Sequence, residues 1–252
     1  MRWIGAAAVV LLVLSAASSF AKCRAPSPIL TPAPGSELPP DPVLWFFARP
    51  QVKAPPLRAR DANGHAIAIE ITDLKEESAP AFRVMRLRLR TGAQAEGKIV
   101  VEYVEPWSDE WKRAEYTIVN RPASPAAGVE ILRQSERQYA WTCSYQSTVD
   151  LSVSIVAPSY RVEWSSTLED YRAGLRRAVV LPGDLSRLFG GSSEDPSTIS
   201  LGHVDCTGTT LEWKDPAIFV GVSALFSDGT ATPMPASPTR LERPDRANLR
   251  RE

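Results

Sequence analysis

Apolar and polar residues alternate along many short stretches of this chain, which is the pattern of half-buried β-strands. In residues 82–90 three apolar side chains face one way and three arginines the other: Met85, Leu87 and Leu89 against Arg86, Arg88 and Arg90. Similar stretches predict strands over 57–60, 65–71, 98–104, 116–119, 139–143, 149–155, 160–164, 199–206 and 217–226. Because helical periodicity is nearly absent, the predicted fold class is all-β.

Two stretches depart from this alternation. Residues 43–47 are continuously apolar, as expected of a buried strand. Within residues 168–188, helical spacing at Leu168, Tyr171 and Leu175 is interrupted by Pro182-Gly183. We expect a crossing loop with a short helix there.

Proline clusters divide the chain. The first runs from Pro26 to Pro42, the second lies at 121–128, and the third covers 233–244. They predict two consecutive β-sandwich domains, 28–121 and 129–235, each near the usual size of one sandwich. The other predicted parts are a signal peptide at 1–21, a leader at 22–27, a linker at 122–128 and a disordered charged tail at 236–252.

The first 21 residues have the three-part layout of a cleavable signal peptide. Arg2 provides the positive charge, residues 4–14 are apolar, and Ser19-Phe20-Ala21 fits the small-x-small cleavage rule. The apolar core is shorter than the roughly 20 residues of a membrane span, so cleavage before Lys22 is favoured over an uncleaved anchor. We therefore expect an extracytoplasmic protein, periplasmic or secreted, with no transmembrane helix in the mature chain.

Three cysteines remain after that cleavage. A lipoprotein anchor at Cys23 would need a small residue before it, and Lys22 does not fit that pattern. In an oxidising compartment a pair of cysteines is expected to bond. Cys143 and Cys206 both fall in strand-like stretches, which favours a Cys143–Cys206 disulfide and leaves Cys23 unpaired.

Composition disfavours several classes of function. Lys+Arg and Asp+Glu both number 29, which gives no reason to expect nucleic acid as a partner. No serine lies in a Gly-x-Ser-x-Gly motif beside the two histidines, His65 and His203, so no enzyme activity is expected. His203 and Asp205 share a strand face, which leaves an exported hydrolase as a remote alternative. Metal-ligand spacings are absent, so neither a metal nor a cofactor is predicted.

Two groups of side chains could bind a ligand. Trp107 and Trp111 stand among acidic residues, as in sandwich modules that stack on sugars. Capping of one end of the sandwich is favoured over this interpretation, because large aromatic side chains are more often buried. The arginines at 86, 88 and 90 could hold an anionic glycan or lipid headgroup. They could also form a charged solvent face that discourages edge pairing.

Two stretches resemble known families. Residues 28–47 contain Pro32-Ala33-Pro34-Gly35, a Leu-Pro pair and an apolar strand with aromatic residues at its end. This order resembles the opening of bacterial Ig-like domains in surface-layer and adhesin-type proteins. Residues 217–233, in which Val222-Ser223-Ala224 leads into a glycine turn, are similar to the last strand of fibronectin type III domains. The resemblances imply an Ig-like or fibronectin type III-like fold in an extracytoplasmic scaffold or adhesive setting.

The favoured function is therefore a non-catalytic binding or scaffold component of the cell envelope or secretome, with an envelope protein or glycan as partner. A carbohydrate-binding module that uses Trp107 and Trp111 is the alternative.

Non-reducing peptide mapping tests the predicted disulfide. We expect one linked pair of peptides that contain Cys143 and Cys206. Such a bridge closes a loop of roughly 60 residues, and the constraint on the unfolded chain is worth on the order of 4 kcal/mol. Alkylation of Cys143 in the unreduced mature protein would contradict the pairing.

Overall fold

The computed structural model describes residues 28–48, 50, 55–80, 82–92, 96–105, 110–120, 127–141, 144–183, 197–204, 208–211 and 214–244. We call residues 28–120 the N-terminal half and residues 127–244 the C-terminal half. The predicted signal peptide, Trp107, Cys23, Cys143 and Cys206 lie outside the described residues.

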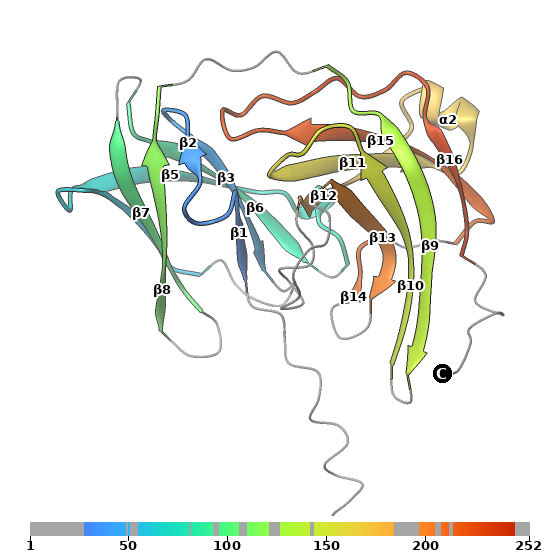
Figure 1. The fold of residues 1–252 in the computed structure, drawn as a ribbon, viewed down its shortest axis with the longest axis horizontal. Helices are drawn as coiled ribbons and strands as arrows, with labels where there is room; N and C mark the ends of the chain where they lie inside the picture. The colour runs from blue at the N-terminus through green and yellow to red at the C-terminus, as the bar shows by residue number, and fades with distance from the viewer. Residues whose placement is uncertain are drawn as a thin grey trace, which may run out of the picture.

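One eight-stranded sheet makes up the N-terminal half, at the left of Figure 1. Its strands are β1 (Ile29–Thr31), β2 (Glu37–Leu38), β3 (Val43–Ala48), β4 (Leu57–Asp61), β5 (Ala66–Asp73), β6 (Arg83–Arg90), β7 (Gly97–Val104) and β8 (Trp111–Ile118). They lie in the order β1-β3-β6-β5-β4-β7-β8-β2, and a short 3-10 helix, η2 (Lys75–Glu77), follows β5. The sheet folds over one core, to which Phe46, Leu87 and Val101 contribute.

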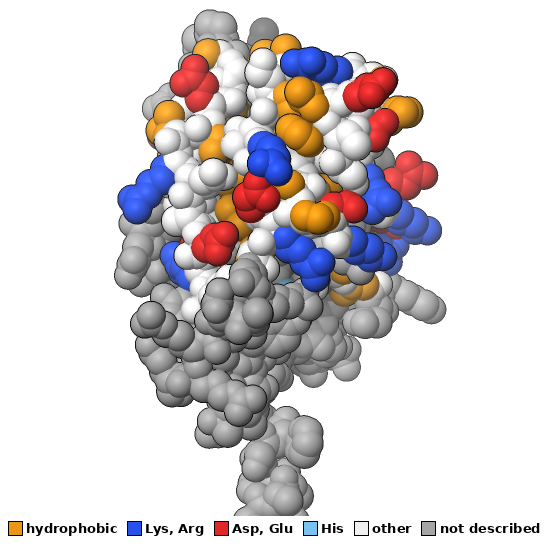
Figure 2. Space-filling model, turned by 90° about the vertical axis from the view of Figure 1, so that its right-hand side faces the viewer, with side chains coloured by type: hydrophobic (Ala, Val, Ile, Leu, Met, Phe, Trp, Pro, Cys, Tyr) orange, Lys and Arg blue, Asp and Glu red, His pale blue; other side chains and the backbone are white. Residues whose placement is uncertain are grey.

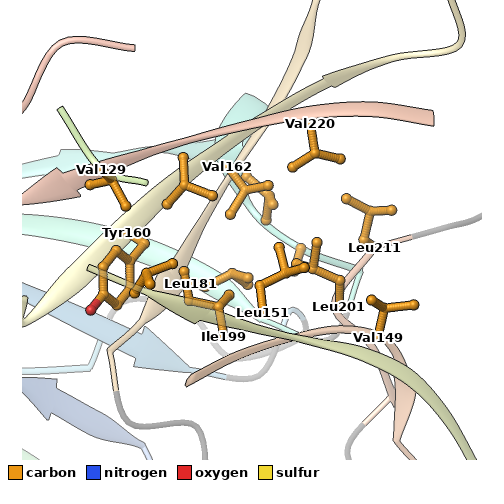
Figure 3. Close-up of a cluster of buried hydrophobic side chains, with 14 of the residues drawn as sticks. Val129, Val149, Leu151, Tyr160, Val162, Leu181, Ile199, Leu201, Leu211 and Val220 are labelled. Carbon is orange, nitrogen blue, oxygen red and sulfur yellow. The ribbon is translucent and has the colours of Figure 1, made fainter. Parts of the chain in front are cut away.

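Two four-stranded sheets make up the C-terminal half. Its elements are β9 (Ile131–Trp141), β10 (Ser144–Val153), β11 (Ser159–Ser165), α2 (Leu168–Arg172), β12 (Arg177–Pro182), β13 (Thr198–Val204), β14 (Gly208–Thr209), β15 (Ala217–Leu225) and β16 (Thr239–Glu242). The orders are β14-β13-β10-β9 and β12-β11-β15-β16. Figure 3 shows the core between them, where Leu151 and Leu201 of one sheet meet Val162 and Val220 of the other. The all-β prediction is confirmed.

The stretch that sequence left ambiguous contains both a helix and a strand. Thr167 caps α2 by accepting a hydrogen bond from the Asp170 backbone nitrogen at 3.0 Å, and Gly174, at a φ of +80°, follows the helix. The short helix is thus confirmed. The sequence did not predict β12, whose six residues pair with β11.

Both faces of β3 are buried, which explains its unbroken apolar sequence. Phe46 points into the core of the N-terminal half and is fully buried. Trp45 and Phe47, on the opposite face, belong to a third cluster that also contains Val180 of β12 and Leu225 of β15. We call this contact between the halves the seam. Sequence predicted burial of the strand, but it gave no sign of what covers the second face.

Polar contacts also cross the seam. The buried hydroxyls of Thr31 and Ser159 lie 2.8 Å apart, and Arg161 pairs with Glu77 at 3.4 Å. The Val43 backbone nitrogen donates to the Ser227 carbonyl at 2.6 Å. Polar groups buried in a contact need such partners, so these bonds fix how the two halves meet.

The residues after 230 are held against β15. The Ala224 nitrogen donates to the Thr232 hydroxyl at 2.9 Å, and β16 then pairs with β15. A disordered tail was expected from residue 236; over 239–242 the structure has a strand instead, because the fully buried Leu241 completes the core. The division of the chain into two domains stays a prediction.

Matched substitutions on the two faces of β3 test the seam. We expect Phe46→Ala and Phe47→Ala each to lower the free energy of unfolding by about 3–5 kcal/mol, because each removes a fully buried ring. Chemical denaturation of the two variants beside the wild type measures both effects. If the second face of β3 were solvated in solution, Phe47→Ala would be close to neutral while Phe46→Ala remained costly.

Candidate functional site

The arginine row predicted from sequence lies on the outward face of β6, between β3 and β5. Arg86 stands opposite Trp45 of β3 and Thr72 of β5, and Arg88 stands opposite Val43 and Glu70. The row thus continues the face of the sheet that forms the seam. It lies at the rim of the seam rather than on a separate solvent face.

The three arginines have different partners. Arg90 holds Glu70 through two hydrogen bonds of 2.8 Å each, which occupy both carboxylate oxygens. Within the described part of the chain, Arg86 and Arg88 form neither a hydrogen bond nor an ion pair, and Nε of Arg88 is buried without an acceptor. Two half-buried guanidinium groups therefore lack a counter-ion.

A turn of the C-terminal half stands beside these two arginines. Its backbone closes through the Phe226 nitrogen on the Thr230 carbonyl at 3.0 Å, and Asp228 accepts from the Thr230 nitrogen at 2.8 Å. Gly229 has a φ of +86°, and a Cβ on it would lie 3.7 Å from Nη2 of Arg86. The arginines are therefore bordered by residues from both halves.

The predicted aromatic site is only partly described. Trp111 begins β8 and is 43% exposed, but the guanidinium carbon of Arg58 lies 3.9 Å from its ring centroid. Trp107 lies outside the described residues. One face of the Trp111 ring is thus covered by a cation, which leaves less of the indole for stacking on a sugar.

Arg58 also links Trp111 to an acidic neighbour. Its Nε donates to Glu102 of β7 at 2.5 Å, and this hydrogen bond is the main cause that lowers the pKa of the Glu102 carboxyl. Lys112 contacts both Glu105 and Glu110, and those hydrogen bonds raise the pKa of its ammonium group. The basic side chains near Trp111 are therefore paired with acidic side chains of the same surface.

The two histidines contact an aspartate and a threonine of the described residues. His65 contacts Asp61 at 3.0 Å in the exposed turn between β4 and β5. His203 contacts the Thr209 hydroxyl at 3.1 Å, and Asp205 lies outside the described residues. Among the described residues, no group of three or more His, Cys, Asp or Glu side chains is placed to hold a metal ion.

The edge strand β9 is a surface that the sequence did not single out. It is eleven residues long, pairs with β10 on one side and ends the order of its sheet. Leu132 is 65% exposed, and residues 133–137 are exposed as well. Figure 1 shows β9 on the right of the molecule, beside β10, and Figure 2 shows charges of both signs mixed with apolar side chains on the side that lies to the right in Figure 1.

One charged pair anchors β9 to its neighbour. Arg137 pairs with Asp150 of β10 at 3.0 Å, and the Asp150 carboxylate is nearly buried. The Ser200 hydroxyl donates to the same carboxylate at 2.7 Å. Arg133 lies on the same face of β9 as Arg137, so this face of the edge is basic.

No family model matches the chain, and no curated protein matches it. Among solved structures, the titin Ig tandem domains A164-A165 align with 86% of this chain and 95% of their own, at 10% identity and a TM-score of 0.23. The titin domains z1z2 in complex with telethonin align with 91% of this chain and 99% of theirs, at 12% identity and a TM-score of 0.23. At such scores these likenesses support no conclusion about this chain, whose all-β fold rests on its own strand pairing.

Among the described residues, no helix is long and apolar enough to cross a membrane.

The Arg58–Glu102 hydrogen bond yields a pKa prediction. We expect Arg58→Ala to raise the pKa of Glu102 toward its ordinary value, and Arg60→Ala, which removes only a weaker charge effect, to raise it less. Carbon-13 NMR titration of the carboxyl group measures both. Because the pKa is lowered in the folded state, the pair stabilises the fold above the ordinary carboxyl pKa, and this contribution disappears as the pH falls through the lowered value. Equal pKa changes in the two variants would contradict the assignment.

Proposed function

We propose that this chain is an exported, non-catalytic β-sandwich protein that acts as a binding component of the cell envelope or secretome, and that it binds an extended segment of a partner protein along β9. The observation that carries the proposal is the length and exposure of this edge strand. An edge strand presents unpaired N–H and C=O groups, which are matched by the backbone of another protein chain. A glycan does not offer such a repeating pattern.

The side chains of β9 define the chemistry of that partner. Arg133 and Arg137 lie on one face, with Ser135 between them, so acidic residues at alternate positions of the partner strand would be favoured. Leu132, at the register shift between β9 and β10, offers an exposed apolar contact. A second copy of this chain fits less well, because antiparallel pairing centred on Ser135 would set Arg133 opposite Arg137 twice.

Export and the disulfide belong to the same proposal. The signal peptide supports an oxidising compartment for the mature chain. The Cys143–Cys206 bridge rests on the sequence: Cys143 lies three residues before Gln146 and Cys206 two residues after Val204, and Gln146 and Val204 are antiparallel partners. The bridge would tie β10 to β13 at the end away from Ile199.

The carbohydrate-binding alternative has less support, since Arg58 covers one face of Trp111. A hydrolase has less still, because His203 contacts a threonine in a strand pair rather than a nucleophile in a cleft.

Two exposed leucines provide a matched test. Leu132 in β9 and Leu175 after α2 are 65% and 69% exposed, so a lysine at either site should leave the fold intact. We expect Leu132→Lys to lower retention of the partner from an extracytoplasmic extract about tenfold or more, because it removes the exposed apolar contact of the edge strand. Leu175→Lys should retain the partner as the wild type does.

Pull-down with the mature protein and quantitative mass spectrometry compare the three proteins, and immobilised cell-wall polysaccharides serve as a parallel arm. Equal loss in both lysine variants would argue against β9 as the site. Retention on polysaccharide that is lost in Trp111→Ala would favour the carbohydrate-binding module instead.

A further inference from the structure

The unpaired arginines at the rim of the seam suggest a second site, independent of β9. Arg86 and Arg88 project from the same face of β6, about 6.8 Å apart along the strand. Both are half-buried, and within the described part of the chain neither has a hydrogen bond or an ion pair. Two cations of this kind repel one another unless an anion lies between them.

The nearby acids do not neutralise this pair. Glu70 stands directly opposite Arg88, but Arg90 holds both of its carboxylate oxygens. In the neighbouring turn, Oδ1 of Asp228 accepts from the nitrogen and the hydroxyl of Thr230 at 2.8 and 2.6 Å. Within the described residues, neither acid forms an ion pair with Arg86 or Arg88, which leaves both arginines available.

Arg88 adds an observation that is independent of charge. Its Nε is removed from water, and the described residues supply no acceptor to replace that water. A buried donor without a partner costs about 1–3 kcal/mol. An unsatisfied donor in a native structure calls for an explanation, and a bound ion is one that fits a guanidinium group.

We infer that Arg86 and Arg88 bind a phosphate or sulfate group at the rim of the seam. A guanidinium group binds two oxygens in a fork, so two guanidinium groups engage three or four oxygens. A tetrahedral oxyanion offers that number, whereas a carboxylate offers two. Arg86 lies beside Gly229, so the bound group would sit against the 226–230 turn and contact both halves of the chain.

Arg90 has a positioning role in this site. If Arg90 is removed alone, Glu70 becomes free to pair with Arg88, which stands opposite it. If Arg90 and Glu70 are removed together, the charges of Arg86 and Arg88 remain unopposed. The single and the double substitution therefore have opposite expected effects on anion binding.

Isothermal titration of the full mature chain with inorganic phosphate, sulfate and acetate tests the site. We expect phosphate and sulfate to bind, acetate to bind about tenfold more weakly, and Arg86→Gln and Arg88→Gln each to lower phosphate affinity about tenfold or more. Arg90→Gln should also weaken binding, and the double variant Glu70→Gln with Arg90→Gln should restore it to within about twofold. Arg113→Gln, a charge-matched control on β8, should bind as the wild type does.

Two further arms define the source of the anion and guard against misfolding. Titration with a short sulfated oligosaccharide and with vesicles that contain phosphatidic acid, each on wild type and Arg88→Gln, separates a glycan or lipid headgroup from a free ion. In the wild type, the NMR resonance of the Arg88 Nε–H should shift when phosphate is added. Phosphate affinity unchanged in Arg86→Gln and Arg88→Gln, or an Arg88 resonance that does not move, would overturn the inference.

Discussion

Burial of β3 on both faces is the constraint on which the rest of the structure depends. One face completes the core of the eight-stranded sheet, and the other packs against β12 and β15 of the C-terminal half. The free energy gained by burial is roughly proportional to the apolar area removed from water. The first face of β3 therefore stabilises the core of the N-terminal half, and the second face stabilises the contact between the halves. The orientation of β6 follows, because its residues 83–88 pair with the whole of β3.

The distance of a polar side chain from the seam also determines whether it has a hydrogen-bond or ion-pair partner. Buried hydroxyls at Thr31 and Ser159 pair with each other, and Glu77 pairs with Arg161. Arg86 and Arg88 stand on β6, where the apolar contact ends, and no acid of the described residues forms an ion pair with them. A row of identical side chains thus acquires distinct roles from its distance to the seam, which explains why Arg90 forms a surface ion pair and its two neighbours do not.

Strands with strict alternation could be predicted from the sequence. The pattern of β6, from Met85 to Arg90, repeats every two residues because apolar and polar side chains face opposite ways. Only the end of β9 was predicted from the sequence. Polar Gln134 and Glu136 occupy its core-side face, so apolar and polar residues do not alternate there. β16 was missed because a single buried leucine, Leu241, carries its packing within a proline-rich stretch. Partners far apart in the chain, such as Arg58 and Trp111, leave no local pattern at all.

The hydrogen bond between Thr31 and Ser159 spans 128 residues of sequence. A ribosome that has completed the N-terminal half has therefore not yet delivered the residues that cover the second face of β3. Until β12 and β15 are synthesised, Trp45 and Phe47 have no cover on the second face of β3, and exposed apolar strands of this kind are prone to aggregate.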